Sequence, residues 1–181
     1  MKYSKILSII IGIIIVLTSV WLYNYLNTSA IEQRLREMMV APISLQSTSN
    51  DLSHKNAYKM VVFVDSTQCS TCLISSFDQW NTIINLTETK YNLNFIFIVN
   101  PTKKALGKTK IAVKHSLIKA PINIDSAGVF IKENPQIPSD PRFHTFLLDE
   151  NDNVILVGNP LQSKEIFNML IQILEAKNKK Q

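Results

Sequence analysis

The hydrophobic pattern of this chain begins with one long apolar segment. An uncharged stretch runs from Ile6 to Ile31, and its first 21 residues end at Leu26. At 1.5 Å per residue they would form about 31 Å of helix, which matches a hydrocarbon core of about 30 Å. Aromatic residues, which favour the lipid–water interface, gather at the far end of this segment. They are Trp21, Tyr23 and Tyr25.

The charges around this segment predict its orientation. Lys2 and Lys5 precede it, and positive charge before a span places the N terminus in the cytoplasm. A cleaved signal peptide ending at the small residues Thr28–Ala30 is the alternative, but the apolar region is long for one and bulky aromatics crowd the site. We therefore predict an uncleaved anchor over residues 1–30 in a single-pass protein, with everything beyond it outside the cytoplasm.

A polar region separates the anchor from the rest of the chain. Residues 31–39 favour a helix that continues the anchor and ends before Pro42. Residues 43–57 are polar and rich in turn-forming types. We predict that residues 31–57 form a juxtamembrane stalk and linker, and that residues 58–181 form one domain.

Within residues 58–181, short continuous apolar runs alternate with amphipathic segments. The runs predict buried strands at 60–64, 95–99, 122–124, 145–148 and 154–157. The other segments predict helices at 70–91, 102–118 and 127–132, and a last helix opened by Asn159–Pro160. The order predicts an α/β domain with a mixed sheet, which is parallel at its centre, carries a hairpin at one edge and has helices on both faces.

Composition adds few constraints. The formal net charge is +5, with 18% charged and 46% hydrophobic residues, which fits a globular or membrane-linked chain. Nucleic-acid binding would require a dense face of basic residues with aromatic platforms, and the chain has only three arginines.

The only two cysteines lie in the segment STQCSTC, directly behind strand 60–64. At a strand-to-helix junction, Cys69 falls at the helix N terminus and Cys72 lies one turn later on the same side. Unpaired amides and the helix dipole stabilise a thiolate at Cys69, and the thiolate is the attacking species in disulfide exchange. Cys72, shielded inside the first turn, would then resolve the mixed disulfide. Ser70 and Thr71 supply hydroxyl donors but no charge.

Other uses of two cysteines remain open. Structural zinc needs four ligands, and the chain has no second cysteine pair. The pair could instead form a purely structural disulfide outside the cytoplasm or remain buried and inert. Copper(I) could bind the two thiolates with a distant histidine, His144 or His115.

Two longer segments carry a family resemblance. MVVFVDSTQCSTC before an amphipathic helix, and FHTFLLDENDNVILVG before the last helix, resemble the thioredoxin-like superfamily. The resemblance is to the membrane-anchored TlpA/ResA-type thiol–disulfide oxidoreductases of bacterial envelopes in particular, and covers roughly residues 43–178. It implies a thioredoxin-like fold, Cys69 as the attacking thiol, Cys72 as the resolving thiol, protein thiols or disulfides as partners, no cofactor, and a periplasmic domain.

The chain departs from the family pattern at three positions. Gln68 stands where the family usually has tryptophan, and Phe143 stands where it has the cis-proline that faces the disulfide. Phe63 takes the place of a buried acid. The missing proline would otherwise keep metals away from the thiols, which favours the copper alternative, and His144 lies close to that position.

These observations predict a membrane-anchored thiol–disulfide oxidoreductase that acts on protein thiols or disulfides. A redox-inert or copper-binding thioredoxin-like module is the alternative. The residues of the candidate site share one loop and one strand start: Gln68, Cys69, Ser70, Thr71, Cys72, Phe143 and His144.

Overall fold

The computed structural model describes residues 2–45, 57–88 and 90–178. Contacts divide the chain into two units, Met1–Glu37 and Met38–Gln181, which we describe separately. The middle of the predicted linker, residues 46–56, lies outside the described residues.

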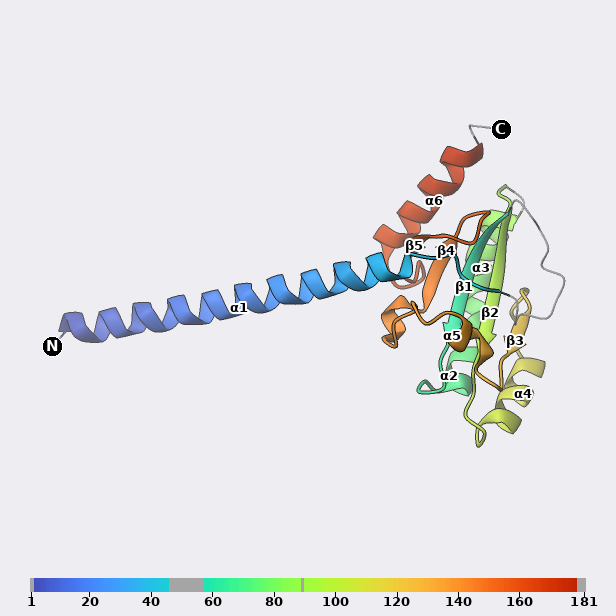
Figure 1. Cartoon of the computed structure of the whole chain (residues 1–181), viewed down its shortest axis with the longest axis horizontal. Helices are drawn as coiled ribbons and strands as arrows, with labels where there is room; N and C mark the ends of the chain where they lie inside the picture. The colour runs from blue at the N-terminus through green and yellow to red at the C-terminus, as the bar shows by residue number, and fades with distance from the viewer. Residues whose placement is uncertain (1, 46–56, 89, 179–181) are drawn as a thin grey trace. The chain divides into compact units, whose positions relative to one another are not determined.

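The first unit consists of one helix, α1, which spans Lys2–Met38 and so ends at the first residue of the second unit (Figure 1). Within the described residues it is the one helix long and apolar enough to cross a membrane, by length and composition, over Ile10–Met38. Its described side chains are almost all exposed, and Trp21 stacks on Tyr25 with ring centroids 5.6 Å apart. As predicted, the helix runs past the apolar segment and ends before Pro42.

The second unit is built on a five-stranded sheet of order β3-β2-β1-β4-β5. The central strands β1, β2 and β3 are parallel, whereas β4 runs antiparallel to β1 and pairs with β5 as a hairpin. The predicted mixed sheet is therefore confirmed. The strand bounds are Tyr58–Val64 (β1), Leu93–Val99 (β2), Ile122–Ile124 (β3), Thr145–Leu148 (β4) and Val154–Val157 (β5).

Both faces of the sheet are covered. On one face Phe77 packs against Phe97 with ring centroids 4.7 Å apart, and Trp80 contacts Phe97 edge-on. On the other face Phe63 contacts Phe130 of α5, with ring centroids 5.1 Å apart. Because β1 is buried on both sides, it reads in sequence as a continuous apolar run.

The predicted helix 70–91 is wrong as one continuous element. The structure divides it into α2 (Ser70–Ile74), the 3-10 turn η1 (Phe77–Trp80) and α3 (Asn81–Glu88). The break falls at two serines: Ser75 Oγ donates to the Cys72 carbonyl at 2.6 Å, and Ser76 Oγ donates to the Leu73 carbonyl at 2.8 Å. Hydroxyls that bond nearby carbonyls compete with the helical pattern.

The remaining helices are α4 (Leu106–Lys114), α5 (Val129–Glu133), the 3-10 turn η2 (Pro141–Phe143) and α6 (Lys164–Asn178). The last helix begins later than predicted. Asn159 does not cap it; its Oδ1 accepts from Leu161 N at 2.9 Å within a separate turn. Ser163 takes that role, because its Oγ accepts from Ile166 N at 3.2 Å.

A short segment at the start of the second unit is bound tightly to it. Met38 and Ile43, which fall in the predicted stalk and linker, are buried, with 0% and 2% exposure. Ser44 N donates to Asn134 Oδ1 at 2.7 Å, and Asn134 Nδ2 donates to the Ser44 carbonyl at 2.9 Å. Ile43 N donates to the Asp152 carbonyl at 2.8 Å. We call residues 38–45 the strap.

The fold class is α/β with a thioredoxin-like arrangement, preceded by an apolar helix. A parallel strand pair precedes an antiparallel hairpin, and the cysteine pair follows the central strand β1 directly. This arrangement places the loop after β1 beside the start of β4, because the two strands are neighbours in the sheet.

Candidate functional site

The two cysteines lie at the junction of β1 and α2, as predicted. Cys69 occupies the N-cap position of α2, with extended backbone (φ −73°, ψ 92°), and its carbonyl accepts from Leu73 N at 3.1 Å. Cys69 and Cys72 are joined by a disulfide, with Cα atoms 5.3 Å apart. The fold therefore accommodates the oxidised pair.

The predicted shielding of Cys72 is wrong. Cys72 is exposed, as is Cys69. The reason is the shortness of α2, which has five residues and turns away after Ile74. The buried positions of this helix are Ser70 and Ile74, so the buried side of α2 excludes both sulfurs.

The side chains between the cysteines differ in their surroundings. Ser70 is buried, whereas Thr71 is half-buried. Thr71 Oγ1 lies 3.6 Å from Cys69 Sγ, and the hydroxyl is the donor because a disulfide sulfur carries no hydrogen. The same contact would stabilise a thiolate at Cys69 after reduction, since a hydrogen bond to the charged form favours it.

A compact turn holds the residue before the motif. Asp65 Oδ1 accepts from Thr67 N at 2.5 Å, and Gln68 Oε1 accepts from Asp65 N at 3.1 Å. Gln68 N donates to the Asp65 carbonyl at 3.1 Å. The carboxylate of Asp65 is thus used to build the turn that presents Cys69. The acidic side chain nearest to the motif in sequence has a structural role here.

His144 lies beside this turn at the start of β4. It is 2% exposed, and its ring centroid is 5.0 Å from that of Phe63. Its Nε2 lies 2.9 Å from the Pro138 carbonyl, and its Nδ1 has no hydrogen-bond partner among the described residues. Phe143, at the position where the resemblance predicts a proline, is buried in η2.

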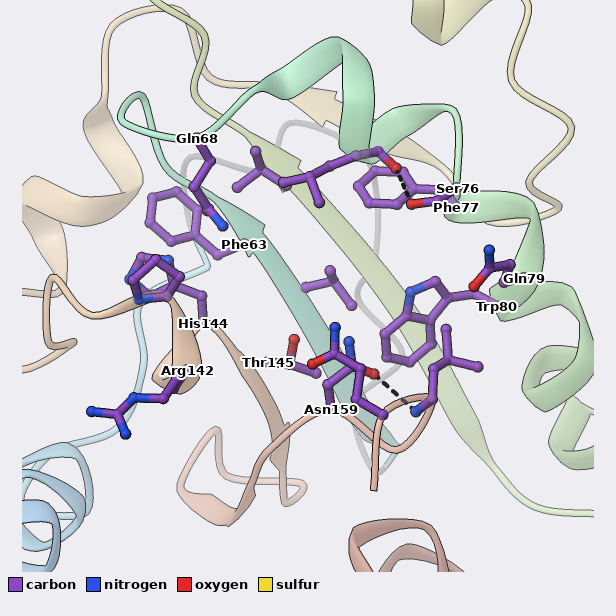
Figure 2. Close-up of a pocket in the computed structure, with 16 residues that line it drawn as sticks. Phe63, Gln68, Ser76, Phe77, Gln79, Trp80, Arg142, His144, Thr145 and Asn159 are labelled. Atoms are coloured by element: carbon purple, nitrogen blue, oxygen red, sulfur yellow. Dashed lines mark hydrogen bonds between the residues drawn. The ribbon is translucent and has the colours of Figure 1, made fainter. Parts of the chain in front are cut away.

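A cavity of about 390 Å³ lies against the motif loop and the start of β4 (Figure 2). Five parts of the chain line it: the end of β1, the motif loop at Gln68, α2 with η1, the η2–β4 segment, and the turn at 159–162. Gln68 and His144 are both lining residues, so the structure brings together two of the predicted near-site residues. Phe143 is not among the lining residues.

The lining of this cavity combines apolar walls with neutral polar groups. Leu73, Phe77 and Trp80 supply apolar surface, and Thr145 and Asn159 add polar groups. Among the residues that the structure describes, no aspartate, glutamate or lysine lines the cavity, and Arg142 is the one charged lining residue.

Arg142 is neutralised by its neighbour Asp140. Its Nη2 lies 2.7 Å from Asp140 Oδ2, and its Nε donates to the same carboxylate at 3.0 Å. The hydrogen bond and the charge of Asp140 raise the pKa of Arg142 above its ordinary value. The guanidinium therefore stays charged and paired with Asp140, on a side chain that is largely exposed, so it adds no unpaired charge to the cavity.

Sequence reasoning did not predict this cavity. Trp80 falls in the predicted helix 70–91, with nothing in the sequence to mark it as a lining residue, and Asn159 is predicted to open the last helix. The Asn159–Pro160 pair was a turn signal as well as a capping signal, and the turn is what brings Asn159 to the cavity.

In the part of the chain that the structure describes, the two cysteines and a histidine are not assembled as a three-ligand copper site. Among the described residues, no group of three or more His, Cys, Asp or Glu side chains is placed to hold a metal ion. Nε2 of His144 bonds the Pro138 carbonyl. His115 is exposed at the end of α4, beside Ser75 and Asp78, and does not line the cavity.

Comparisons with known proteins add little to this description. No protein-family model matches the chain. No curated protein matches it. Among solved structures, the chain is similar to Mycobacterium tuberculosis AhpC, with 15% sequence identity and a TM-score of 0.38 over 70% of this chain and 76% of that one. The fold assignment rests on the strand order and pairing.

Proposed function

We propose that this chain is a membrane-anchored, extracytoplasmic thiol–disulfide oxidoreductase of the TlpA/ResA type. The observation that carries the proposal is the exposed Cys69–Cys72 pair, which closes as a disulfide at the end of the central strand. An isolated pair that can close without distorting the fold and that faces solvent suits reversible exchange with another protein.

The exchange is a two-step transfer of two electrons. In the reducing direction, the Cys69 thiolate attacks one sulfur of a partner disulfide, forms a mixed disulfide and releases the partner's first thiolate. The Cys72 thiolate then attacks Cys69 Sγ, closes the Cys69–Cys72 disulfide and releases the second thiolate. Two protons follow the electrons to the partner, and the reverse sequence oxidises a partner dithiol.

The groups around the pair support Cys69 as the attacking residue. It sits at the start of α2, where the first backbone N–H groups have no helical partner, and Thr71 Oγ1 is within reach of its sulfur. The contribution of the helix dipole is smaller than the sequence predicted, because α2 has only five residues. We therefore expect hydrogen bonding from Thr71 and the amides to be the main cause of thiolate stabilisation.

The proposal is tested with the full chain in detergent. The Cys72→Ser variant is first treated with the symmetrical disulfide dithiobis(nitrobenzoate), which forms a mixed disulfide at Cys69. A thiol of a reduced protein substrate should then displace thionitrobenzoate and leave the substrate joined to Cys69 as a stable covalent adduct. The matched Cys69→Ser variant should accumulate far less. A glutathione redox titration of the wild type should give a reversible two-electron transition. Absence of both the adduct and the transition would exclude the proposed activity.

A further inference from the structure

The charges of the second unit are unevenly distributed along the chain. Residues 89–124 contain seven lysines and no aspartate or glutamate. In the rest of the unit, residues 38–88 and 125–181, twelve acidic residues outnumber eight basic ones. The positive charge of the second unit is therefore concentrated in one segment, which includes α4.

Most of these lysines have no partner within the described protein. Lys90 pairs with Glu175, and Lys119 Nζ donates to Asn85 Oδ1 at 2.5 Å. The other five are exposed, and no ion pair or side-chain hydrogen bond joins them to a described residue; they are Lys103, Lys104, Lys108, Lys110 and Lys114. Their charges are free to meet a partner.

Helix α4 presents its lysines on the exposed side. Thr109 is buried, whereas Lys110 and Lys114 lie one turn apart and face solvent. Like charges at this spacing destabilise a helix, and a partner that carries carboxylates would relieve the repulsion. Two apolar side chains are exposed on the same segment: Ile111 is 63% exposed and Leu117, just after the helix, is 78% exposed. The surface combines positive charge with apolar contact area, which suits a protein of opposite charge.

This surface lies beside the cysteine pair. Helix α4 packs against α2, and Figure 1 shows the two helices next to each other at the same end of the second unit. A hollow of about 270 Å³ lies where they meet, and its walls include Ile74, Ser75, Ala112 and Leu117. We call it the α2–α4 pocket. Ser75 Oγ donates to the Cys72 carbonyl at 2.6 Å, so the pocket begins within one turn of the exposed Cys72.

Two kinds of partner carry dense negative charge: acidic proteins and anionic lipid headgroups. The α2–α4 pocket favours a protein, because a side chain can enter a concave surface that a flat layer of headgroups would leave unfilled. Asp78 also lines the pocket, so the pocket would receive an uncharged side chain while the lysines of α4 meet the carboxylates. The position beside Cys72 favours a protein that exchanges disulfides with the pair.

We propose that the exposed side of α4 and the α2–α4 pocket form the docking surface for an acidic protein, the partner in thiol–disulfide exchange. This docking role rests on the proposed function, because it specifies the kind of protein on which the cysteine pair acts. Exposed ion pairs are individually weak, but a cluster of lysines raises the rate of encounter with a negatively charged partner, and salt screens this effect. The expected signature is a preference for acidic partners that is lost at high salt.

The test compares three synthetic peptides that contain the same disulfide ring, flanked by glutamates, by glutamines or by lysines. The reduced full chain in nonionic detergent is mixed with each peptide disulfide, and the oxidised chain with each peptide dithiol. The exchange is quenched with acid, and rate constants are obtained by chromatography. Each rate constant is divided by that of the same peptide with mercaptoethanol or its disulfide, which corrects for the effect of the flanking charges on the peptide's own thiols.

The corrected rates should depend on charge and on salt. At about 0.05 M salt the glutamate peptide should react about tenfold faster than the glutamine peptide, and the lysine peptide should react more slowly than both. At about 0.5 M salt the three corrected rates should agree within about twofold, because the charges are then screened.

Charge reversals locate the surface. Lys110→Glu and Lys114→Glu should each slow the glutamate peptide by about twofold to fivefold at low salt and leave the glutamine peptide unchanged. Lys164→Glu is the matched control, because Lys164 is exposed in α6 and the substitution makes the same change in net charge. It should leave the ratio of the two rates nearly unchanged. An equal loss in all three variants would mean that net charge, rather than α4, attracts the peptide, and would overturn the proposal.

The remaining outcomes separate the docking surface from the exchange activity. Equal corrected rates for all three peptides at low salt would overturn the docking surface and leave the proposed function intact. No exchange with any peptide would exclude the proposed function and the docking surface with it. Hydrogen exchange of α4 is also compared in nanodiscs of phosphatidylcholine with and without phosphatidylglycerol. Equal exchange in both supports a protein partner, whereas protection only in the anionic nanodiscs would assign the surface to lipid headgroups and overturn the proposal.

Discussion

Asn134 provides the sharpest test of how the strap is held. Its side chain is fully buried and makes three hydrogen bonds: two with the backbone of Ser44 and one, at 2.8 Å, to the Phe130 carbonyl. Asn134→Ala removes all three. The Phe130 carbonyl keeps the Asn134 backbone N–H at 3.1 Å, so the loss falls on Ser44, whose N–H and carbonyl both lose their partner.

The magnitude follows from those two groups. Each buried backbone group left without a partner costs about 1–3 kcal/mol. Ser44 is half-buried, so water can reach part of it and the lower end of that range applies. We expect the free energy of unfolding to fall by about 2–4 kcal/mol in total. Gln136→Ala is the matched control, because Gln136 is only half-buried and its bond to the Pro42 carbonyl is exposed and long, at 3.4 Å.

The assay is urea unfolding of the full chain in detergent. Trp80 fluorescence reports on the second unit if Trp21, which lies in α1, is replaced by phenylalanine in every variant. With a slope of about 2 kcal/mol per molar urea, in the middle of the usual range, Asn134→Ala should lower the midpoint by about 1–2 M. Hydrogen exchange at the Ser44 amide should speed up in this variant and remain slow in Gln136→Ala.

Two results would refute the reasoning. A midpoint that moves no more in Asn134→Ala than in Gln136→Ala would mean that the bonds to Ser44 contribute nothing net. If Asn134→Ala lowers the midpoint by the full expected amount while hydrogen exchange at the Ser44 amide stays slow, Asn134 stabilises the protein only through its bond within α5. Either result would mean that the bonds between Asn134 and the strap do not stabilise the domain.

Three further predictions concern other parts of the chain. Gly158 has φ +133°, and an added Cβ would lie 2.9 Å from Ile166 Cδ1. Gly158→Ala should therefore lower the free energy of unfolding by more than about 1 kcal/mol in the same urea titration. An unchanged free energy of unfolding would contradict this. Burial raises the pKa of Asp149, but hydrogen bonds from Asn153 and Asn151 outweigh it and hold that pKa below its ordinary value. The stability that the Asp149 carboxylate adds is present above its unfolded pKa and is lost as the pH falls through its folded pKa. Asp149→Asn should therefore make the free energy of unfolding less dependent on pH below about pH 4. An unchanged pH dependence in this range would contradict the prediction. After mild reduction of intact bacterial cells that express the chain, a membrane-impermeant maleimide should label the cysteine pair, and labelling only after lysis would reverse the predicted orientation.

Local pattern was enough to predict the sheet. The strands at 122–124, 145–148 and 154–157 were predicted with the bounds that the structure has, because short apolar runs between turn residues leave little choice of element. The cysteine pair was placed correctly for the same reason: a buried run followed by an amphipathic segment defines a strand–helix junction.

The wrongly predicted helix boundaries lie at hydroxyl and amide side chains that form hydrogen bonds with nearby backbone groups. Ser75 and Ser76 end α2 after five residues, and that early turn also leaves Cys72 exposed. Asn159 forms a turn where a helix cap was predicted. Helical periodicity continues through such a break, because the apolar residues on either side still face the same core, so the pattern alone does not reveal it.

The cavity could not be predicted for a different reason. Its walls come from segments that lie far apart in sequence, from Val62 to Gln162, and only the pairing of β1 with β4 brings Gln68 close to His144. That pairing was part of the predicted hairpin edge, but the depth of the cavity depends on side-chain packing.

The strap also determines the residue at which a water-soluble fragment of the chain should begin. Met38 is the last residue of α1 and is at the same time the first residue of the second unit, where it is fully buried. A water-soluble fragment that starts at Tyr58, where the sheet begins, would leave an uncovered hydrophobic hollow where Met38 and Ile43 belong. Expression vectors for such a fragment should start no later than Met38, and those that start at Tyr58 should give aggregated material.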